Sequence, residues 1–163
     1  MRAVTFLFLM GIAVALSGCA SKFRTYDGPD VTFLLAYKED RKLLLMHGDR
    51  VLRSFDFELG FAPGGDKTVE GDGKTPEGLY FIDRRNPNSK FHLSLGISYP
   101  NAADRAAARA LGQSPGGDIF IHGTPKKFRG DADWTWGCLA VTDEEMEIIY
   151  AMVNVGTPIM IYP

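Results

Sequence analysis

Cysteine is scarce in this sequence, and its scarcity excludes a scaffold held together by disulfides. Only Cys19 and Cys138 occur among the 163 residues, so the chain can form one bridge at most. A domain of this length buries about 70% of the surface that its unfolded chain exposes, so it needs no covalent staple. Internal repeats and low-complexity tracts are also missing. We therefore expect one ordinary globular domain.

Basic charge and clustered metal ligands are lacking too. The 18 lysine and arginine residues are outnumbered by 20 acidic residues, which gives a net charge of -2 at pH 7. A protein that binds nucleic acid normally presents a basic face, so we expect no nucleic-acid partner. The three histidines, His47, His92 and His122, do not have a metal-ligand spacing such as HxxxH. We therefore predict no metal and no cofactor.

The main hydrophobic run lies at the N-terminus and is too short for a transmembrane helix. Residues 3–16 are almost wholly apolar and follow Arg2, whereas a bilayer span needs roughly 18 such residues. This layout is typical of a secretory signal peptide. Leu16-Ser17-Gly18-Cys19 resembles a bacterial lipobox, which implies that Cys19 becomes the first mature residue and carries lipid on its sulfur. The alternative is an ordinary signal peptide with an incidental cysteine.

These features divide the chain into three parts. We predict a lipoprotein signal peptide at residues 1–18, a lipid-anchored tether at residues 19–30 and a single domain at residues 31–163. The mature protein is then exported and anchored by its lipid at the periplasmic face of a bacterial membrane. A lipidated Cys19 cannot form a disulfide, which leaves Cys138 as a lone thiol.

Strand patterns dominate the domain, and its first three strands are separated by tight turns that indicate an antiparallel meander. The expected strands are residues 31–37, 42–46, 51–59, 79–83, 93–99, 118–122 and 159–162. A glycine-rich loop is expected at residues 60–78. One helix is expected at residues 102–111 after the cap Asn101, and another after the capping box of Thr142 and Glu145. The pattern predicts a mostly β fold, a sandwich or mixed sheet, with two short helices.

The stretch from Ile119 to Val141 holds the residue types that acyl transfer needs. A cysteine attacks a carbonyl as the thiolate, and an imidazole can take its proton and later return it to a leaving amine. Cys138 and His122 lie at positions from which side chains can project at a sheet rim. Gly137 lets a substrate carbonyl approach the amides of Gly137 and Cys138, which can form an oxyanion hole. The alternative is a buried structural cysteine and a structural histidine at a strand end.

Three residues beside Cys138 are candidates for substrate binding. Trp134 and Trp136 can form the floor of a subsite for sugar or peptide, or they can pack in the core. Thr135 can hydrogen-bond near the thiol or cap a turn. The sequence leaves these alternatives open.

Together these residues resemble the signature of the L,D-transpeptidases, the YkuD-like domains. The matching segments are His122-Gly123-Thr124 and, after a gap, Thr135-Trp136-Gly137-Cys138-Leu139. Weaker matches are Lys74-Thr75-Pro76-Glu77-Gly78 and Gly156-Thr157-Pro158-Ile159. The resemblance extends over about residues 31–162, and it implies a β-rich catalytic domain without a metal.

The resemblance also implies a reaction. Cys138 is the nucleophile and His122 the base, a backbone carbonyl near Gly123 orients the imidazole, and Gly137 helps to form the oxyanion hole. The cysteine attacks the L,D-amide between meso-diaminopimelate and D-alanine in a peptidoglycan stem peptide and forms a thioester. An amine of another stem, or water, resolves the thioester. The implied partners are peptidoglycan stem peptides and, through the lipid on Cys19, the membrane.

One position departs from the family pattern. Many members carry arginine two residues after the cysteine, where this chain has Ala140. A guanidinium there would grip a substrate carboxylate, and sequences of the G-C-x-A type resemble a branch that includes enzymes that cleave murein bonds. The alternative function is therefore a murein hydrolase, either a carboxypeptidase, an endopeptidase or an amidase, with the same Cys138 and His122. A non-catalytic wall-binding lipoprotein is the third hypothesis.

Overall fold

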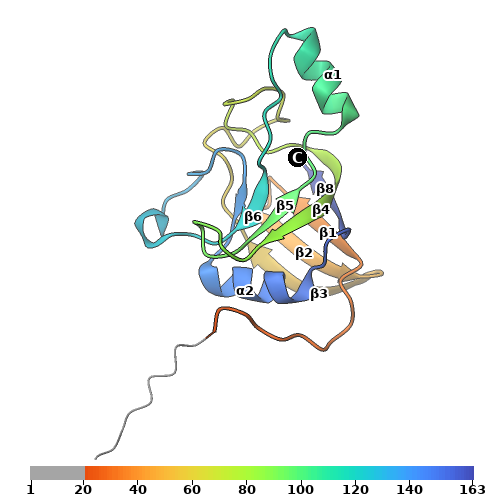
Figure 1. Cartoon of the computed structure of the whole chain (residues 1–163), viewed down its shortest axis with the longest axis vertical. Helices are drawn as coiled ribbons and strands as arrows, with labels where there is room; N and C mark the ends of the chain where they lie inside the picture. The colour runs from red at the N-terminus through yellow and green to blue at the C-terminus, as the bar shows by residue number, and fades with distance from the viewer. Residues whose placement is uncertain (1–20) are drawn as a thin grey trace, which may run out of the picture.

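Eight strands form a single mixed sheet in the computed structural model, which describes residues 21–163 (Figure 1). Their order across the sheet is β3-β2-β1-β8-β4-β5-β6-β7. The strands are β1 (Phe33–Tyr37), β2 (Lys42–His47), β3 (Arg50–Asp56), β4 (Gly78–Asn86), β5 (Ser94–Ile97), β6 (Phe120–His122), β7 (Leu139–Ala140) and β8 (Pro158–Tyr162). The helices are α1 (Ala102–Ala110) and α2 (Asp143–Met152), with a short 3-10 turn at Lys126–Phe128.

The prediction of a mostly β fold with two short helices is confirmed. Of the two arrangements expected, the chain adopts the mixed sheet. The predicted signal peptide at residues 1–18 and the lipidation site at Cys19 lie outside the described residues.

The predicted meander forms β1, β2 and β3, which pair antiparallel in sequence order. Leu34 and Ala36 of β1 and Leu43 and Leu45 of β2 are fully buried, because alternate residues of a strand face the same side of the sheet. β8 then pairs parallel with β1 and antiparallel with β4. The last strand of the chain therefore joins the meander to the second half of the sheet.

The sheet curls until its two edges meet. Glu58, just after the edge strand β3, bridges Ala140 of the opposite edge strand β7. The Glu58 amide donates to the Ala140 carbonyl at 2.8 Å, and the Ala140 amide donates back at 2.9 Å. This closure satisfies backbone groups that an open edge would leave unpaired. It also fixes β6 and β7 beside the loop that follows β3.

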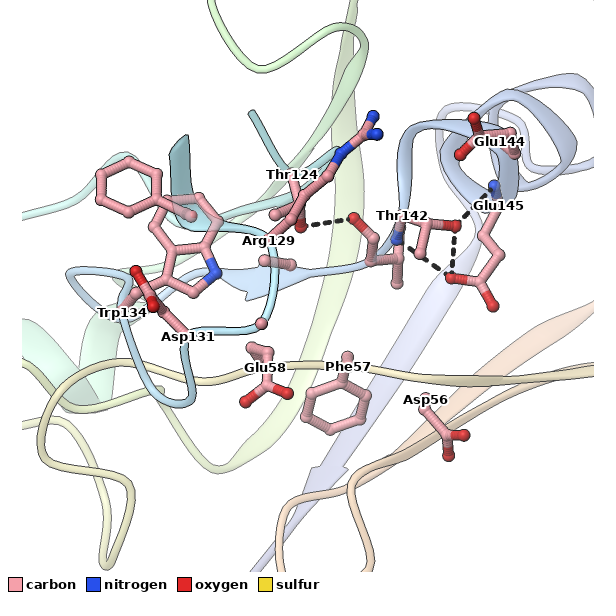
Figure 2. Close-up of a pocket in the computed structure, with 14 residues that line it drawn as sticks. Asp56, Phe57, Glu58, Thr124, Arg129, Asp131, Trp134, Thr142, Glu144 and Glu145 are labelled. Carbon is pink, nitrogen blue, oxygen red and sulfur yellow. Dashed lines mark hydrogen bonds between the residues drawn. The ribbon is translucent and has the colours of Figure 1, made fainter. Parts of the chain in front are cut away.

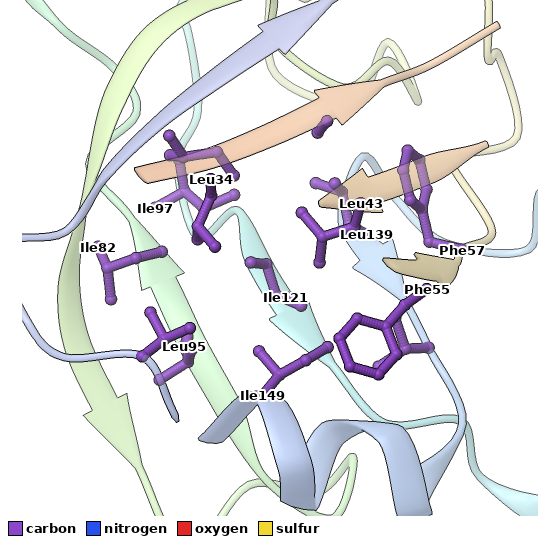
Figure 3. Close-up of a cluster of buried hydrophobic side chains, with 14 of the residues drawn as sticks. Leu34, Leu43, Phe55, Phe57, Ile82, Leu95, Ile97, Ile121, Leu139 and Ile149 are labelled. Carbon is purple, nitrogen blue, oxygen red and sulfur yellow. The ribbon is translucent and has the colours of Figure 1, made fainter. Parts of the chain in front are cut away.

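The hydrophobic core fills the inside of the curl, and α2 packs against it from one side (Figure 3). Met146 and Ile149 of α2 are fully buried against strand residues such as Leu95 and Ile121. Full burial of a side chain of this size contributes roughly 1.5–3 kcal/mol. The core thus holds together the same strands that carry the candidate site.

Both helices begin where the sequence predicts. Thr142 and Glu145 form the expected capping box, in which the Glu145 amide donates to Thr142 Oγ1 at 3.2 Å and the Thr142 amide donates to Glu145 Oε2 at 3.0 Å. The Asn101 side chain accepts hydrogen bonds from the first amides of α1. α1 projects from one end of the domain and buries only Ala108 (Figure 1). Neither α1 nor α2, the helices of residues 21–163, is long and apolar enough to cross a membrane.

β4 is longer than predicted, because a charged segment continues the strand to Asn86. The Arg85 guanidinium donates to the carbonyls of Tyr150 and Val153 at the end of α2, both at 2.6 Å. These bonds satisfy carbonyls that a helix C-terminus leaves without partners. A charged residue is stable in this strand because the helix end is its partner.

Candidate active site

The parallel pairing of β6 and β7 brings His122 and Cys138 to the same cleft. Ile121 pairs with Leu139 and His122 pairs with Ala140. Cys138 therefore lies immediately before β7, the strand that is paired with the end of β6. Both residues line one cleft of about 500 Å³. The other lining residues come from the end of β4, the segment between β4 and β5, β5, and the start of β6 with the residues just before it: Asn86, Asn88, Ser89, Lys90, Phe91, Ser94, Asp118 and Phe120.

The His122 imidazole is oriented by its own backbone neighbourhood. Its Nδ1 lies 2.8 Å from the Gly123 carbonyl oxygen, so Nδ1–H donates there and Nε2 is left as the proton acceptor. Phe91 stacks on the ring at 4.5 Å between centroids, and Trp134 packs at 5.5 Å. Burial lowers the pKa of His122, which is 3% exposed, and the bond to Gly123 opposes this only in part. The imidazole is therefore neutral near pH 7.

The Cys138 thiol is protonated at rest. Its Sγ lies 3.6 Å from the Asp118 carbonyl oxygen, to which the thiol donates. Desolvation is the main cause that raises the pKa of Cys138 to about 11; the Asp118 carboxylate acts in the same direction, and the backbone hydrogen bond with Phe120 acts against it. The site thus holds a neutral thiol beside a neutral base, and the thiolate forms only when the proton moves.

Gly123 is needed for close packing around the histidine. A Cβ at Gly123 would lie 2.4 Å from Asp143 Oδ1 and 2.9 Å from the Phe91 carbonyl oxygen. The Gly123 amide donates to that same Phe91 carbonyl at 3.0 Å. The absence of a side chain therefore brings the Phe91 ring onto the imidazole.

The turn that carries Cys138 is capped by Thr135. The Thr135 hydroxyl donates to the Cys138 carbonyl at 2.8 Å and accepts from the Gly137 amide at 3.2 Å. Of the two roles considered for Thr135, the structure shows the cap. Because the Gly137 amide is already bonded, the Cys138 amide is the better candidate for an oxyanion donor.

Gly137 has a structural requirement that the sequence did not reveal. Its φ is +113°, and a Cβ there would lie 2.3 Å from the Lys74 carbonyl oxygen. The glycine-rich loop at residues 60–78 packs directly against the cysteine turn at this point. A side chain at position 137 is therefore excluded by the backbone of this loop.

Two buried lysines hold the glycine-rich loop. Lys38, which is 3% exposed, donates to the Gly65 carbonyl at 2.6 Å and forms an ion pair with Glu77 at 2.6 Å. Lys67, which is 4% exposed, pairs with Asp72 at 2.8 Å. No local sequence signal distinguishes these two lysines from solvated ones, because their partners are set by the fold.

The two tryptophans have different surroundings. Trp134 packs between the imidazole of His122 and the ring of Phe128, which stacks on it at 4.2 Å. Trp136 is 71% exposed and touches Phe61 edge-on at 5.1 Å. Trp134 therefore supports the histidine, while Trp136 presents its indole to solvent.

A second cavity of about 470 Å³ has Trp134 in its wall (Figure 2). Its lining is rich in carboxylates, namely Asp56, Glu58, Asp131, Glu144 and Glu145. Neither Cys138 nor His122 contributes to its wall. Within residues 21–163 no group of three or more His, Cys, Asp or Glu side chains could hold a metal ion.

The described part of the predicted tether contacts the candidate site. Lys22 Nζ donates to the carbonyls of Pro87 at 2.6 Å and His92 at 3.1 Å, at the two ends of the segment that forms one wall of the cleft. Arg24 pairs with Glu147 of α2 at 2.9 Å. The residues that follow the predicted lipidation site thus lie against the domain.

Residues that sequence analysis missed complete the wall around the pair. Phe91 stacks on His122, Ser94 is paired with His122 in the β5–β6 register, and the Asp118 carbonyl accepts from the thiol. Asp118 has a φ of +55°, which is unusual for a residue with a side chain. No local sequence signal predicts these contacts, because they depend on strand pairing.

The fold is a curled β domain in which a histidine at the end of one strand and a cysteine just before the parallel neighbouring strand line one cleft. Residues 32–161 match the YkuD family, described as the L,D-transpeptidase catalytic domain. The chain belongs to this family, and the predicted resemblance is confirmed.

Curated and solved relatives agree with the family. YafK from Escherichia coli strain K12, whose name places it among the L,D-transpeptidases, is 26% identical over 157 residues, which cover 93% of this chain and 58% of YafK. The helical cell shape determining protein Pgp2 from Campylobacter jejuni is 25% identical, with a TM-score of 0.63 over 83% of this chain and 49% of Pgp2. An L,D-transpeptidase from Mycobacterium smegmatis has a TM-score of 0.55 at 16% identity, over 82% of this chain and 59% of that protein. The chain spans about half the length of these relatives.

Alkylation of Cys138 by iodoacetamide is expected to accelerate far into the alkaline range. Because the pKa of the thiol is raised to about 11, the thiolate fraction grows roughly tenfold per pH unit up to that value. The rate is measured by mass spectrometry in a Cys19→Ser variant, whose single thiol is Cys138. The same chain unfolded in urea is the control, and its rate levels off near pH 8.5 to 9. A folded protein whose rate levels off near neutrality would contradict the neutral resting pair.

Proposed function

We propose that this protein is a cysteine-dependent L,D-transpeptidase that acts on peptidoglycan stem peptides. The observation that carries the proposal is that Cys138 and His122 line one cleft, with Nδ1 of the histidine bonded to the Gly123 carbonyl. That bond leaves Nε2 free to act as a base. Membership of the L,D-transpeptidase catalytic domain family supplies the reaction class.

The proposed reaction proceeds in two acyl transfers. His122 Nε2 takes the thiol proton as Cys138 Sγ attacks the carbonyl of meso-diaminopimelate that is joined to D-alanine. The carbon–nitrogen bond breaks, and the imidazolium returns the proton to the D-alanine amine, which leaves. The amine of a second stem then attacks the thioester and passes a proton to His122; the carbon–sulfur bond breaks as the new amide forms, and the imidazolium returns the proton to the Cys138 sulfur.

The electrostatics of the site suit proton transfer within the pair. The lowered pKa of His122 and the raised pKa of Cys138 disfavour a resting ion pair. As the thiolate attacks, negative charge moves to the substrate oxygen, where we expect the Cys138 amide to donate. Such a donor typically contributes about 3 kcal/mol to lowering the barrier.

Hydrolysis of the thioester is the second candidate, and Ala140 favours it. Ala140 is 1% exposed, and its backbone is bonded to Glu58, so this position offers no guanidinium to a substrate carboxylate. Without this contact the site binds the stem peptides less tightly, and water can resolve the thioester in place of the amine of a second stem. The enzyme would then act as a murein hydrolase through the same pair.

We also propose that the protein works at the periplasmic face of a bacterial membrane, anchored by lipid on Cys19. This location follows from the signal peptide and lipobox patterns at residues 1–19. The peptidoglycan substrate lies outside the cytoplasm, so the proposed location is consistent with the proposed reaction. Metabolic labelling with a radioactive fatty acid tests it: label lost in a Cys19→Ser variant supports the anchor, and label retained refutes it.

The purified protein incubated with disaccharide-tetrapeptide tests the proposed function. Mass spectrometry of the products should show a crosslinked dimer together with released D-alanine. Shortened stems without a dimer would assign the hydrolytic reaction. No change in the substrate, with no adduct on Cys138, would contradict both reactions and favour a wall-binding lipoprotein.

A further inference from the structure

Two large aromatic side chains lie exposed beside the nucleophile and have no role in the proposed chemistry. Trp136 is 71% exposed and Phe61 is 51% exposed, and their rings meet edge to face at 5.1 Å. Neither residue lines the cleft that holds Cys138. Large aromatic side chains normally bury much of their surface, so an exposed pair of this kind marks a candidate binding surface.

The pair is held in place by backbone contacts. The Phe61 amide donates to the Thr135 carbonyl at 3.0 Å, and the Thr135 amide donates to the Leu59 carbonyl at 3.1 Å. Gly73 leaves room for the Phe61 ring, because a Cβ at Gly73 would lie 2.3 Å from that ring. The glycine-rich loop and the cysteine turn thus hold the backbone that carries the two rings before any ligand binds, which reduces the entropy lost on binding.

The pair lies within reach of a glycan-linked stem. Trp136 and Cys138 are two residues apart, so their Cα atoms are separated by at most about 7 Å. In a stem peptide, the carbonyl that the thiol attacks belongs to the third residue, and three extended residues span about 10–11 Å. This reach exceeds the separation between Trp136 and Cys138, so the sugar that carries the stem can contact Trp136 when this carbonyl is at the sulfur.

We propose that Phe61 and Trp136 form a platform for an N-acetylated sugar of the glycan strand whose stem peptide occupies the cleft. This inference rests on the proposed function and extends its substrate from the stem to the sugar. The carbon–hydrogen face of a pyranose ring packs well on an exposed indole, which offers apolar contact and one N–H donor. The stem itself carries carboxylates, which would need cations, and these two rings supply none.

Substrate preference tests the platform in the active enzyme. The preference is the ratio of kcat/KM for disaccharide-tetrapeptide to kcat/KM for the same tetrapeptide without sugar. In Trp136→Ala and Phe61→Ala this ratio should fall roughly five- to tenfold. Phe81→Ala is the matched control, because Phe81 is 48% exposed on β4 and should keep the wild-type ratio. An unchanged ratio in Trp136→Ala would overturn the platform.

Sugar binding can also be measured without turnover, which separates this inference from the proposed function. Titration calorimetry with chitotetraose should give a heat of binding in the wild-type protein and in Phe81→Ala, and should lose it in Trp136→Ala. That result would support the platform even if the protein proved inactive on stems. Equal binding by all three proteins, or self-association that Trp136→Ala abolishes, would overturn it.

Discussion

Replacing Cys138 by alanine is expected to abolish acyl transfer, lowering kcat by roughly 10⁴- to 10⁶-fold. The thiol forms the covalent bond to the stem, and among the described residues no other cysteine is present. Cys138→Ser should be almost as inactive, because a hydroxyl is a much weaker nucleophile than a thiol in the same place. The measurement is D-alanine release from disaccharide-tetrapeptide.

The stability of these variants distinguishes chemistry from folding. The Cys138 side chain lies at the wall of the cleft and is only partly buried, so both variants should unfold within a few degrees of the wild type. Thermal unfolding followed by circular dichroism checks this. A Cys138→Ala protein that is folded and releases D-alanine at the wild-type rate would refute the nucleophile.

Replacing His122 by glutamine should lower kcat/KM by roughly 10²- to 10⁴-fold. Glutamine can still hydrogen-bond in this place, but it cannot accept the thiol proton. The pKa of His122 is lowered from its ordinary value, so the wild-type imidazole remains an acceptor below pH 6.5 and activity declines only at more acidic pH, where the ring gains a proton. In His122→Gln this acid limb of the pH profile should disappear.

His47→Gln is the matched control for this variant. His47 is exposed at the end of β2, and its Nδ1 lies 2.8 Å from the Asp30 carbonyl oxygen, away from the cleft. The activity of His47→Gln and the acid limb of its pH profile should equal those of the wild type. If His122→Gln kept the acid limb, another group would have to be the base.

Local signals in the sequence predicted the elements that local physics determines. The capping box of Thr142 and Glu145 and the cap at Asn101 depend on bonds within a few residues, and both form as expected. The meander follows from alternating apolar residues and short turns. The motif around His122 and Cys138 identified residues that the structure brings to one cleft.

Features that depend on distant partners could not be predicted from the sequence. The bridge between Glu58 and Ala140 closes the sheet through residues far apart in the chain. The need for glycine at position 137 arises from the Lys74 carbonyl, which only the folded loop places there. Arg85 is stable in β4 because it caps α2. In each case the partner is known only once the strands are paired.

The most direct test of the account is the mass of the protein itself during turnover. The protein is mixed with disaccharide-tetrapeptide, quenched in acid within the first turnovers and analysed intact. We predict a mass increase equal to the substrate less D-alanine, located on Cys138 by peptide mapping and lost on treatment with hydroxylamine. Turnover without any adduct on Cys138, or an adduct on another residue, would contradict the central claim that this sulfur carries the acyl group.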